Sequence, residues 1–153
     1  MSILFDEIVF GPVKSRRLGV SLGINLLPSD YKYCSFDCIY CECGSRKGKG
    51  SSEQGLPSRE QVRQALEARM KELHQQGPVP DAITFAGNGE PTIHPDFPAI
   101  LEDTRQLRDT WFPDTPIGVL SNASMLHRKD VMEALRKSEL NMLKLDAGTE
   151  ETF

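Results

Sequence analysis

Hydrophobic residues along the chain recur at two different spacings, and the two alternate. In residues 20–26 an apolar side chain occupies every second position, which predicts a strand with one buried face. Three further short apolar runs, at 81–87, 116–122 and 141–148, predict three more strands. The segments between these strands are longer and follow a different period.

That second period is helical. Apolar residues three or four positions apart predict helices after Ser58, after Pro95 and over residues 128–138. The first of these begins with a capping-box pair, Ser58 and Gln61, and ends near Gly77-Pro78. Strands that alternate with helices over short connections imply a parallel sheet with helical crossovers. The sequence therefore predicts an α/β fold.

Composition narrows the class of protein. The chain has 153 residues, of which 39% are hydrophobic, and a net charge of −4, which suits one globular domain rather than a general binder of polyanions. No apolar run is long enough to cross a bilayer, and residues 1–10 carry acids where a signal peptide would be basic. We therefore expect a cytoplasmic protein with no membrane partner.

All four cysteines lie between positions 34 and 43, directly after the first predicted strand. Cys34, Cys38 and Cys41 are spaced C-x3-C-x2-C, and Cys43 follows. In a reducing cytosol, clustered thiols hold a metal or carry out redox chemistry more often than they form disulfides. A disulfide between such close neighbours would close only a small loop and add little stability. The cysteines therefore predict a metal or redox site.

Thiolates are soft ligands that suit zinc or iron–sulfur clusters. A structural zinc site usually takes four ligands from two separated pairs, whereas this sequence has no second pair and no histidine close to the first. Three well-spaced cysteines suit three irons of a four-iron cluster and leave the fourth iron open. The spacing favours an iron–sulfur cluster on Cys34, Cys38 and Cys41 over zinc, with Cys43 as a bystander.

Other candidate residues follow the later strands. GNGEPT (87–92) comes after the second strand, SNAS (121–124) after the third, and Lys144 and Asp146 close the fourth. Because ligands in parallel α/β folds bind at the carboxyl ends of the strands, we expect these segments to meet the cysteine segment at one edge. Lys144 and Asp146 share one face of their strand, so a buried ion pair explains them as well as a ligand contact does.

Two motifs together carry a resemblance to a known family. The C-x3-C-x2-C segment, with Tyr40 before its last cysteine, resembles the signature of the radical S-adenosylmethionine enzymes, and GNGEP resembles their Gly-Gly-Glu-Pro motif. Within that superfamily the chain is similar to the branch that includes wybutosine-synthesis-type iron–sulfur oxidoreductases. The stretches that carry this likeness are FGPVKSRRLGVSLGINLLPSDYKYCSFDCIYC (10–41) and TFAGNGEPTIHPDF (84–97).

The resemblance implies roles for single residues. Cys34, Cys38 and Cys41 would ligate a [4Fe–4S] cluster, and its open iron would be chelated by S-adenosylmethionine. The residues implied in binding that cofactor are Tyr40 against the adenine, Gly87, Asn88, Gly89, Glu90 and Pro91 around the methionine ammonium, Ser121 and Asn122 nearby, and Lys144 or Asp146 at the ribose. Asn88 departs from the commoner glycine. Because Asn tolerates the left-handed region, we expect the turn to survive.

The implied activity is that of a radical enzyme, an iron–sulfur oxidoreductase. One electron from the cluster would cleave S-adenosylmethionine to methionine and a 5′-deoxyadenosyl radical, which abstracts a hydrogen atom from an unknown substrate, a tRNA base or a protein. A reductant such as flavodoxin or ferredoxin would supply the electron. Two other functions stay open: an iron–sulfur electron carrier without S-adenosylmethionine, and a zinc-stabilised cysteine-cluster binding module. Arg16 and Arg17 are surface charge or bind a carboxylate of substrate or cofactor.

The predicted elements, together with the resemblance, divide the chain into an N-terminal leader, 1–19, and residues 20–153. The resemblance implies that 20–153 are the N-terminal part of a partial (β/α) barrel of the radical S-adenosylmethionine type. A closed eight-unit barrel takes around 250 residues, so we expect a barrel truncated after its fourth strand, with Thr149 as the cap of a further helix. The fourth strand would then be an exposed edge with apolar Leu143 and Leu145, through which chains could pair. We expect the isolated chain to be poorly stable, oligomeric or unable to turn over its substrate.

Overall fold

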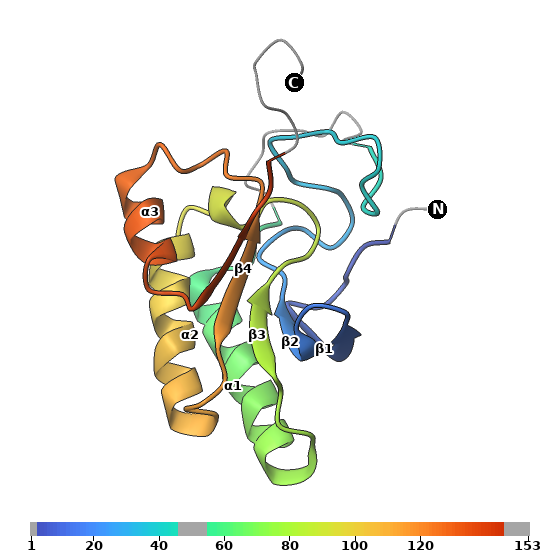
Figure 1. Ribbon diagram of the computed structural model, residues 1–153. Helices are drawn as coiled ribbons and strands as arrows, with labels where there is room; N and C mark the ends of the chain where they lie inside the picture. The colour runs from blue at the N-terminus through green and yellow to red at the C-terminus, as the bar shows by residue number, and fades with distance from the viewer. Residues whose placement is uncertain (1–2, 46–54, 146–153) are drawn as a thin grey trace.

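The computed structural model describes residues 3–45 and 55–145, which form one mixed α/β unit (Figure 1). Its centre is a five-stranded sheet in the order β1-β2-β3-β4-β5. The strands are β1 (Val9–Ser15), β2 (Gly19–Ile24), β3 (Ala82–Phe85), β4 (Ile117–Ser121) and β5 (Leu140–Leu143). From β2 to β5 all pairings are parallel, as the alternation of strands and helices predicted.

Three α-helices of the described residues connect the parallel strands and lie together on one side of the sheet (Figure 1). They are α1 (Arg59–Gln76), α2 (Phe97–Trp111) and α3 (Lys129–Leu135), with a short 3-10 helix, η1 (Pro91–Ile93), before α2. The predicted capping box is confirmed, because the Ser58 and Gln61 side chains each accept the other's backbone N–H. Within the described residues, no helix is both long and apolar enough to cross a membrane.

The two faces of the sheet differ in chemistry. On one face large apolar side chains pack against the helices and form the core, with Leu22, Ile24, Ile83, Phe85, Ile117 and Val119 from the central strands. The alternate positions on β2, β3 and β4 are small or polar except for Leu120, and the buried hydroxyls of Ser21 and Thr84 lie 2.7 Å apart. The residues on this second face are too small and polar to form a second hydrophobic core.

Strand β1 was not predicted. It lies within the segment expected to be a leader and pairs antiparallel with β2. Its register shifts between Phe10 and Val13, around Gly11-Pro12. Proline lacks a donor for the ladder and is tolerated on edge strands and at bulges. β1 therefore pairs with β2 on both sides of the irregularity at Gly11-Pro12.

The predicted fourth strand is shorter than expected. β5 ends at Leu143, whereas the sequence predicted a strand to residue 148. Asp146, the expected cap Thr149 and much of the Gly- and Ser-rich segment 44–57 lie outside the described residues. Within the described residues β5 pairs only with β4, and Leu143 and Leu145 are exposed. The sheet described here is open, and closure into a barrel stays a prediction.

Helices α1 and α2 are joined by an ion pair that the sequence did not predict. Arg59 donates from Nε and Nη2 to the two carboxylate oxygens of Asp103 at 2.6 and 2.8 Å, and Arg63 lies 3.3 Å away. The Asp103 side chain is only 7% exposed. The hydrogen bond from Arg59 lowers the pKa of Asp103, although burial acts in the opposite direction.

Because the folded-state pKa of Asp103 is depressed, its stabilising effect is present above the unfolded value of about 4 and is lost as the pH falls through the folded value. We predict that Asp103→Asn lowers the free energy of unfolding at neutral pH by about 1–3 kcal/mol and flattens its decline in acid. Urea unfolding at a series of pH values measures both. Arg59→Met should flatten the decline in the same direction; an Asp103→Asn curve parallel to wild type would contradict the assignment.

Candidate functional site

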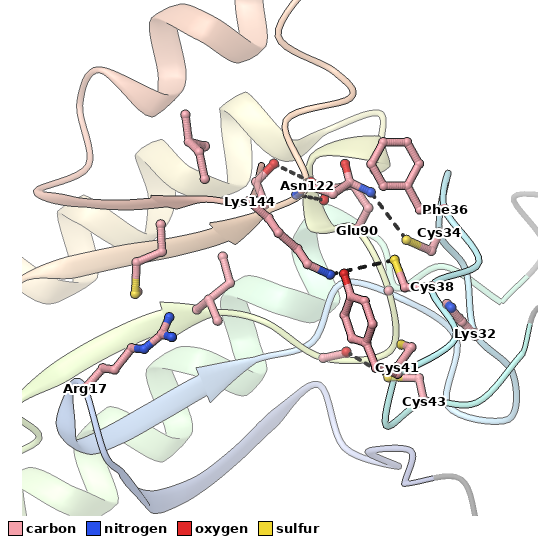
Figure 2. Close-up of a pocket in the computed structure, with 17 residues that line it drawn as sticks. Arg17, Lys32, Cys34, Phe36, Cys38, Cys41, Cys43, Glu90, Asn122 and Lys144 are labelled. Carbon is pink, nitrogen blue, oxygen red and sulfur yellow. Dashed lines mark hydrogen bonds between the residues drawn. The ribbon is translucent and has the colours of Figure 1, made fainter. Parts of the chain in front are cut away.

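A cavity of about 490 Å³ opens at the carboxyl ends of the parallel strands (Figure 2). It is lined by the segment that carries the cysteines, the turn after β3, and the ends of β4 and β5. The expected convergence of these segments on one edge is therefore observed. The predicted site residues that line the cavity are Cys34, Cys38, Tyr40, Cys41, Gly87, Gly89, Glu90, Ser121, Asn122 and Lys144. Asn88 and Pro91 do not line it, and Asp146 lies outside the described residues.

The cysteine segment and the turn after β3 meet through their backbones. Tyr33 donates its N–H to the carbonyl of Asn88 at 2.8 Å and accepts at its own carbonyl from the N–H of Glu90 at 3.1 Å. Gly89 lies between these bonds with a φ of 146°, and a Cβ at this position would overlap the carbonyl oxygen of Tyr33. A residue with a side chain could not adopt this arrangement without displacing the cysteine segment.

Asn88 has a different role from the one expected. Its backbone does not use the left-handed region, which is adopted instead by Gly87 and Gly89 on either side. The Asn88 side chain is buried and turns toward the N-terminal segment, where Nδ2 donates to the carbonyls of Phe5 and Pro28 at 2.8 and 2.7 Å. Its Oδ1 accepts the N–H of Phe5 at 2.8 Å. Asn88 therefore anchors residues near the N-terminus beneath the site.

The Glu90 carboxylate links β3 to β4. Glu90 is 2% exposed, and its Oε1 accepts from the Ser121 hydroxyl at 2.8 Å and from the N–H of Thr92 at 3.2 Å. Its Oε2 accepts the N–H of Asn122 at 2.6 Å. An ionised carboxylate has about four acceptor sites, so Oε2 keeps acceptor capacity toward the cavity. Glu90 can thus position the end of β4 and still receive a donor from a ligand.

Asn122 links Glu90 to the cysteine segment. Its Nδ2 donates to the Ser35 hydroxyl at 2.9 Å and lies 3.5 Å from the Cys34 sulfur (Figure 2). Its Oδ1 accepts the N–H of Ser124 at 3.0 Å, and Ala123 between them has a φ of 66°, uncommon for a residue with a side chain. The tight turn after β4 directs the Asn122 amide toward the sulfur.

The four cysteines, all within the described residues, are half-buried and form no disulfide. Burial raises the pKa of the Cys34 thiol, and burial together with the neighbouring Cys41 raises the pKa of Cys43 to about 11. Cys43 was expected to be a bystander, yet it also lines the cavity, and its thiol donates to the carbonyl of Gly87 at 3.5 Å. It therefore joins the cysteine segment to the glycine turn.

Lys144 lies beside Tyr40 and Cys38. Its Nζ is 4.1 Å from the centre of the Tyr40 ring and 3.7 Å from the Cys38 sulfur (Figure 2). The first contact is a cation–π interaction, which holds the ammonium group over the aromatic face. Both residues are exposed at the mouth of the cavity. The structure therefore brings Tyr40 and Lys144 together, in a position to contact one part of the same ligand.

Two charged residues of the cavity were missed or left unassigned. Lys32 was not singled out by the sequence; its side chain is 1% exposed, and Nζ lies 3.2 Å from the Asp37 carboxylate. Burial alone would lower the pKa of Lys32. The hydrogen bond to Asp37 and the nearby Cys41 raise it by more, so the pKa of Lys32 lies above its usual value. Arg17 lines the end of the cavity away from the cysteines (Figure 2), while Arg16 does not line the cavity.

The geometry of the thiols can be compared with the requirements of a metal site. Within residues 3–45 and 55–145, no three His, Cys, Asp or Glu side chains converge closely enough to hold a single metal ion. A four-iron cluster requires less convergence, because each cysteine ligates a different iron. Three half-buried thiols that face one cavity, beside a glycine turn with exposed backbone, fit such a cluster and a ligand on its open iron.

Relatives of the chain are longer than the chain itself. It is 37% identical over 152 residues to a protein of Brachyspira hyodysenteriae named GTPase Obg, covering 99% of this chain and 21% of that protein. It is 36% identical over 146 residues to a UPF0026 protein of Methanocaldococcus jannaschii and 34% identical over 140 residues to one of Helicobacter pylori, covering 95% and 92% of this chain and 42% of each relative. The chain thus spans less than half the length of these curated relatives.

No solved structure matches the chain. The radical SAM superfamily, by contrast, matches residues 29–149, a range that includes the cysteine segment, the glycine turn and the ends of all the parallel strands after β2. This match covers most of the chain. The protein belongs to the radical SAM superfamily.

Proposed function

We propose that the chain binds a [4Fe–4S] cluster through Cys34, Cys38 and Cys41 and S-adenosylmethionine beside it, as the catalytic part of a radical enzyme. The observation that carries the proposal is the single cavity in which these three thiols face the turn Gly87–Gly89 and the Glu90 carboxylate. When bound there, the two cofactors would supply a 5′-deoxyadenosyl radical that abstracts a hydrogen atom from the substrate.

The residues of the chain divide the work of binding. Gly87 and Gly89 line the cavity with their backbone. The absence of side chains lets this turn pack against Asn25 and Tyr33. Glu90 can accept a hydrogen bond from the ammonium group of the methionine part, and it also positions Asn122 by accepting its backbone N–H. Tyr40 and Lys144, already in contact, are placed to hold the adenosine part through the aromatic ring and an N–H donor.

The far end of the cavity suits the substrate. Leu120, Met142 and Leu143 add apolar surface to the cavity, and Arg17 adds a positive charge at the end away from the cysteines (Figure 2). Arginine binds carboxylate and phosphate groups through paired donors, so this end suits a substrate with an apolar part next to an anionic group. A tRNA base beside its phosphate has this character, in agreement with the wybutosine-synthesis-type branch; a protein carboxylate is the other candidate.

Anaerobic reconstitution with iron and sulfide tests the function. We expect the protein to gain the visible absorption of an iron–sulfur cluster and, with dithionite and S-adenosylmethionine, to release 5′-deoxyadenosine. Cluster uptake without 5′-deoxyadenosine would favour an electron carrier. Zinc uptake with no stable iron–sulfur cluster would favour a binding module.

Substitution of single cysteines tests the ligand set. We predict that Cys34→Ala, Cys38→Ala and Cys41→Ala each lose most of the bound iron, because each removes one iron ligand. Cys43→Ala is the matched control: it removes the weak bond to the Gly87 carbonyl and the contact with the Cys41 thiol, and it should keep iron near the wild-type level. Iron and sulfide analysis after reconstitution measures the result. Equal iron loss in Cys43→Ala and Cys38→Ala would show that the ligand set is wrong.

Glu90→Ala tests the cofactor turn. We predict a loss of S-adenosylmethionine affinity of about tenfold or more, equivalent to about 1.4 kcal/mol. The cluster iron should be retained, because Glu90 is not one of the proposed iron ligands. Calorimetric titration of the reconstituted protein measures the affinity. Thr92→Val removes the Thr92 hydroxyl donor to the same carboxylate outside the cavity and keeps the Thr92 backbone N–H, so it should change the affinity by no more than about twofold. Unchanged affinity in Glu90→Ala would leave Glu90 with a structural role alone.

A further inference from the structure

Lys32 is a buried cation at the centre of the cysteine segment. Its Nζ donates to Asp37 Oδ1 and to the carbonyl of Gly44, both at 3.2 Å. Asp37 lies between the first two cysteines of the motif, and Gly44 follows the last cysteine. One ammonium group therefore connects the first part of the cysteine segment to its C-terminal end. The whole residue is 5% exposed. Lysine is almost never this buried unless its charge is balanced.

The balance provided by the described residues is incomplete. Asp37 is a carboxylate partner, but its side chain is 46% exposed, so water weakens the attraction. The carbonyl of Gly44 contributes only a dipole. Lys32 lines the same cavity as Cys34, Cys41 and Cys43, and Figure 2 shows its ammonium group among the cysteine side chains. The groups near the Lys32 ammonium therefore include the half-exposed Asp37 carboxylate, the Gly44 carbonyl and the Cys34 and Cys41 thiols.

We propose that Lys32 is a positioning residue whose charge raises the reduction potential of the cluster held by this segment. The inference rests on the proposed function, since it takes a cluster in this cavity as given. Three thiolates give a bound cluster negative charge, and reduction adds one more electron. A fixed cation in a site shielded from water stabilises the reduced form more than the oxidised form, and local charge is one of the factors that set such potentials.

A structural role alone makes a different prediction. If Lys32 only connects the two ends of the segment, then removing either Lys32 or its partner Asp37 loosens the same contact and changes the cluster in the same direction. If its charge acts on the cluster, the two changes have opposite signs: loss of Lys32 removes a positive charge, and neutralisation of Asp37 removes a negative one. The signs of the shifts in the Lys32 and Asp37 variants therefore distinguish an effect of charge from a purely structural effect.

The experiment compares wild type with Lys32→Gln, Lys32→Arg and Asp37→Asn after anaerobic reconstitution. Iron content is measured first, and the potential is then titrated by electron paramagnetic resonance without S-adenosylmethionine. We expect a more negative potential in Lys32→Gln, a more positive one in Asp37→Asn, and one near wild type in Lys32→Arg. Gln keeps a donor toward Gly44, and Asn keeps an acceptor toward Lys32, so both variants preserve hydrogen bonding.

Each other outcome counts against the inference. Shifts of the same sign in Lys32→Gln and Asp37→Asn, or no shift in either, overturn it while leaving the proposed function intact. If Lys32→Gln takes up no iron, Asp37→Asn decides alone, and anything other than a positive shift overturns the inference. If neither takes up iron, Lys32 is structural and the inference fails. A wild-type protein that takes up no cluster overturns the proposed function and this inference with it.

Discussion

The site depends on the backbone contact between Tyr33 and Gly89. Tyr33 immediately precedes the first cysteine and Gly89 immediately precedes Glu90, so this contact fixes the two motifs relative to each other. The absence of a Cβ at Gly89 allows it. From Glu90 the connection continues to Asn122 and from Asn122 to Cys34, which closes a ring of bonds around one wall of the cavity. A shift of any one member would move the others.

Buried polar side chains support this ring from below. Asn25, at the end of β2, accepts the N–H of Asn88 at 3.1 Å, and Asn88 in turn binds the backbone of Phe5. The N–H of Ile3 donates to the carbonyl of Glu42 at 2.8 Å, so the N-terminal segment also contacts the cysteine segment. Unpaired polar groups in such positions are costly. The network therefore favours one arrangement of the loops before any ligand is bound.

The sequence was informative where a residue pattern reports one local preference. Alternating apolar runs and the Ser58–Gln61 pair predicted the parallel strands and α1, and the rule that ligands gather at strand ends placed the cysteines and Glu90 at one edge. It failed where long-range contacts decide. Residues 1–19 were assigned to a leader, yet β1 forms there and continues around Gly11-Pro12, because β2 supplies the pairing. The inward turn of the Asn88 side chain depends on Phe5 and Pro28, which are distant from it along the chain. The burial of Lys32 depends on how the cysteine segment folds around its ammonium group.

The central claim is that the cysteines hold a cluster with one iron open to S-adenosylmethionine in the adjacent turn. Electron paramagnetic resonance of the dithionite-reduced, reconstituted protein, recorded with and without S-adenosylmethionine, tests it most directly. A cofactor bound to the open iron changes the ligand field of the cluster, so the account predicts a different spectrum once the cofactor is added. Identical spectra at saturating S-adenosylmethionine, from a protein with full cluster content, would contradict it.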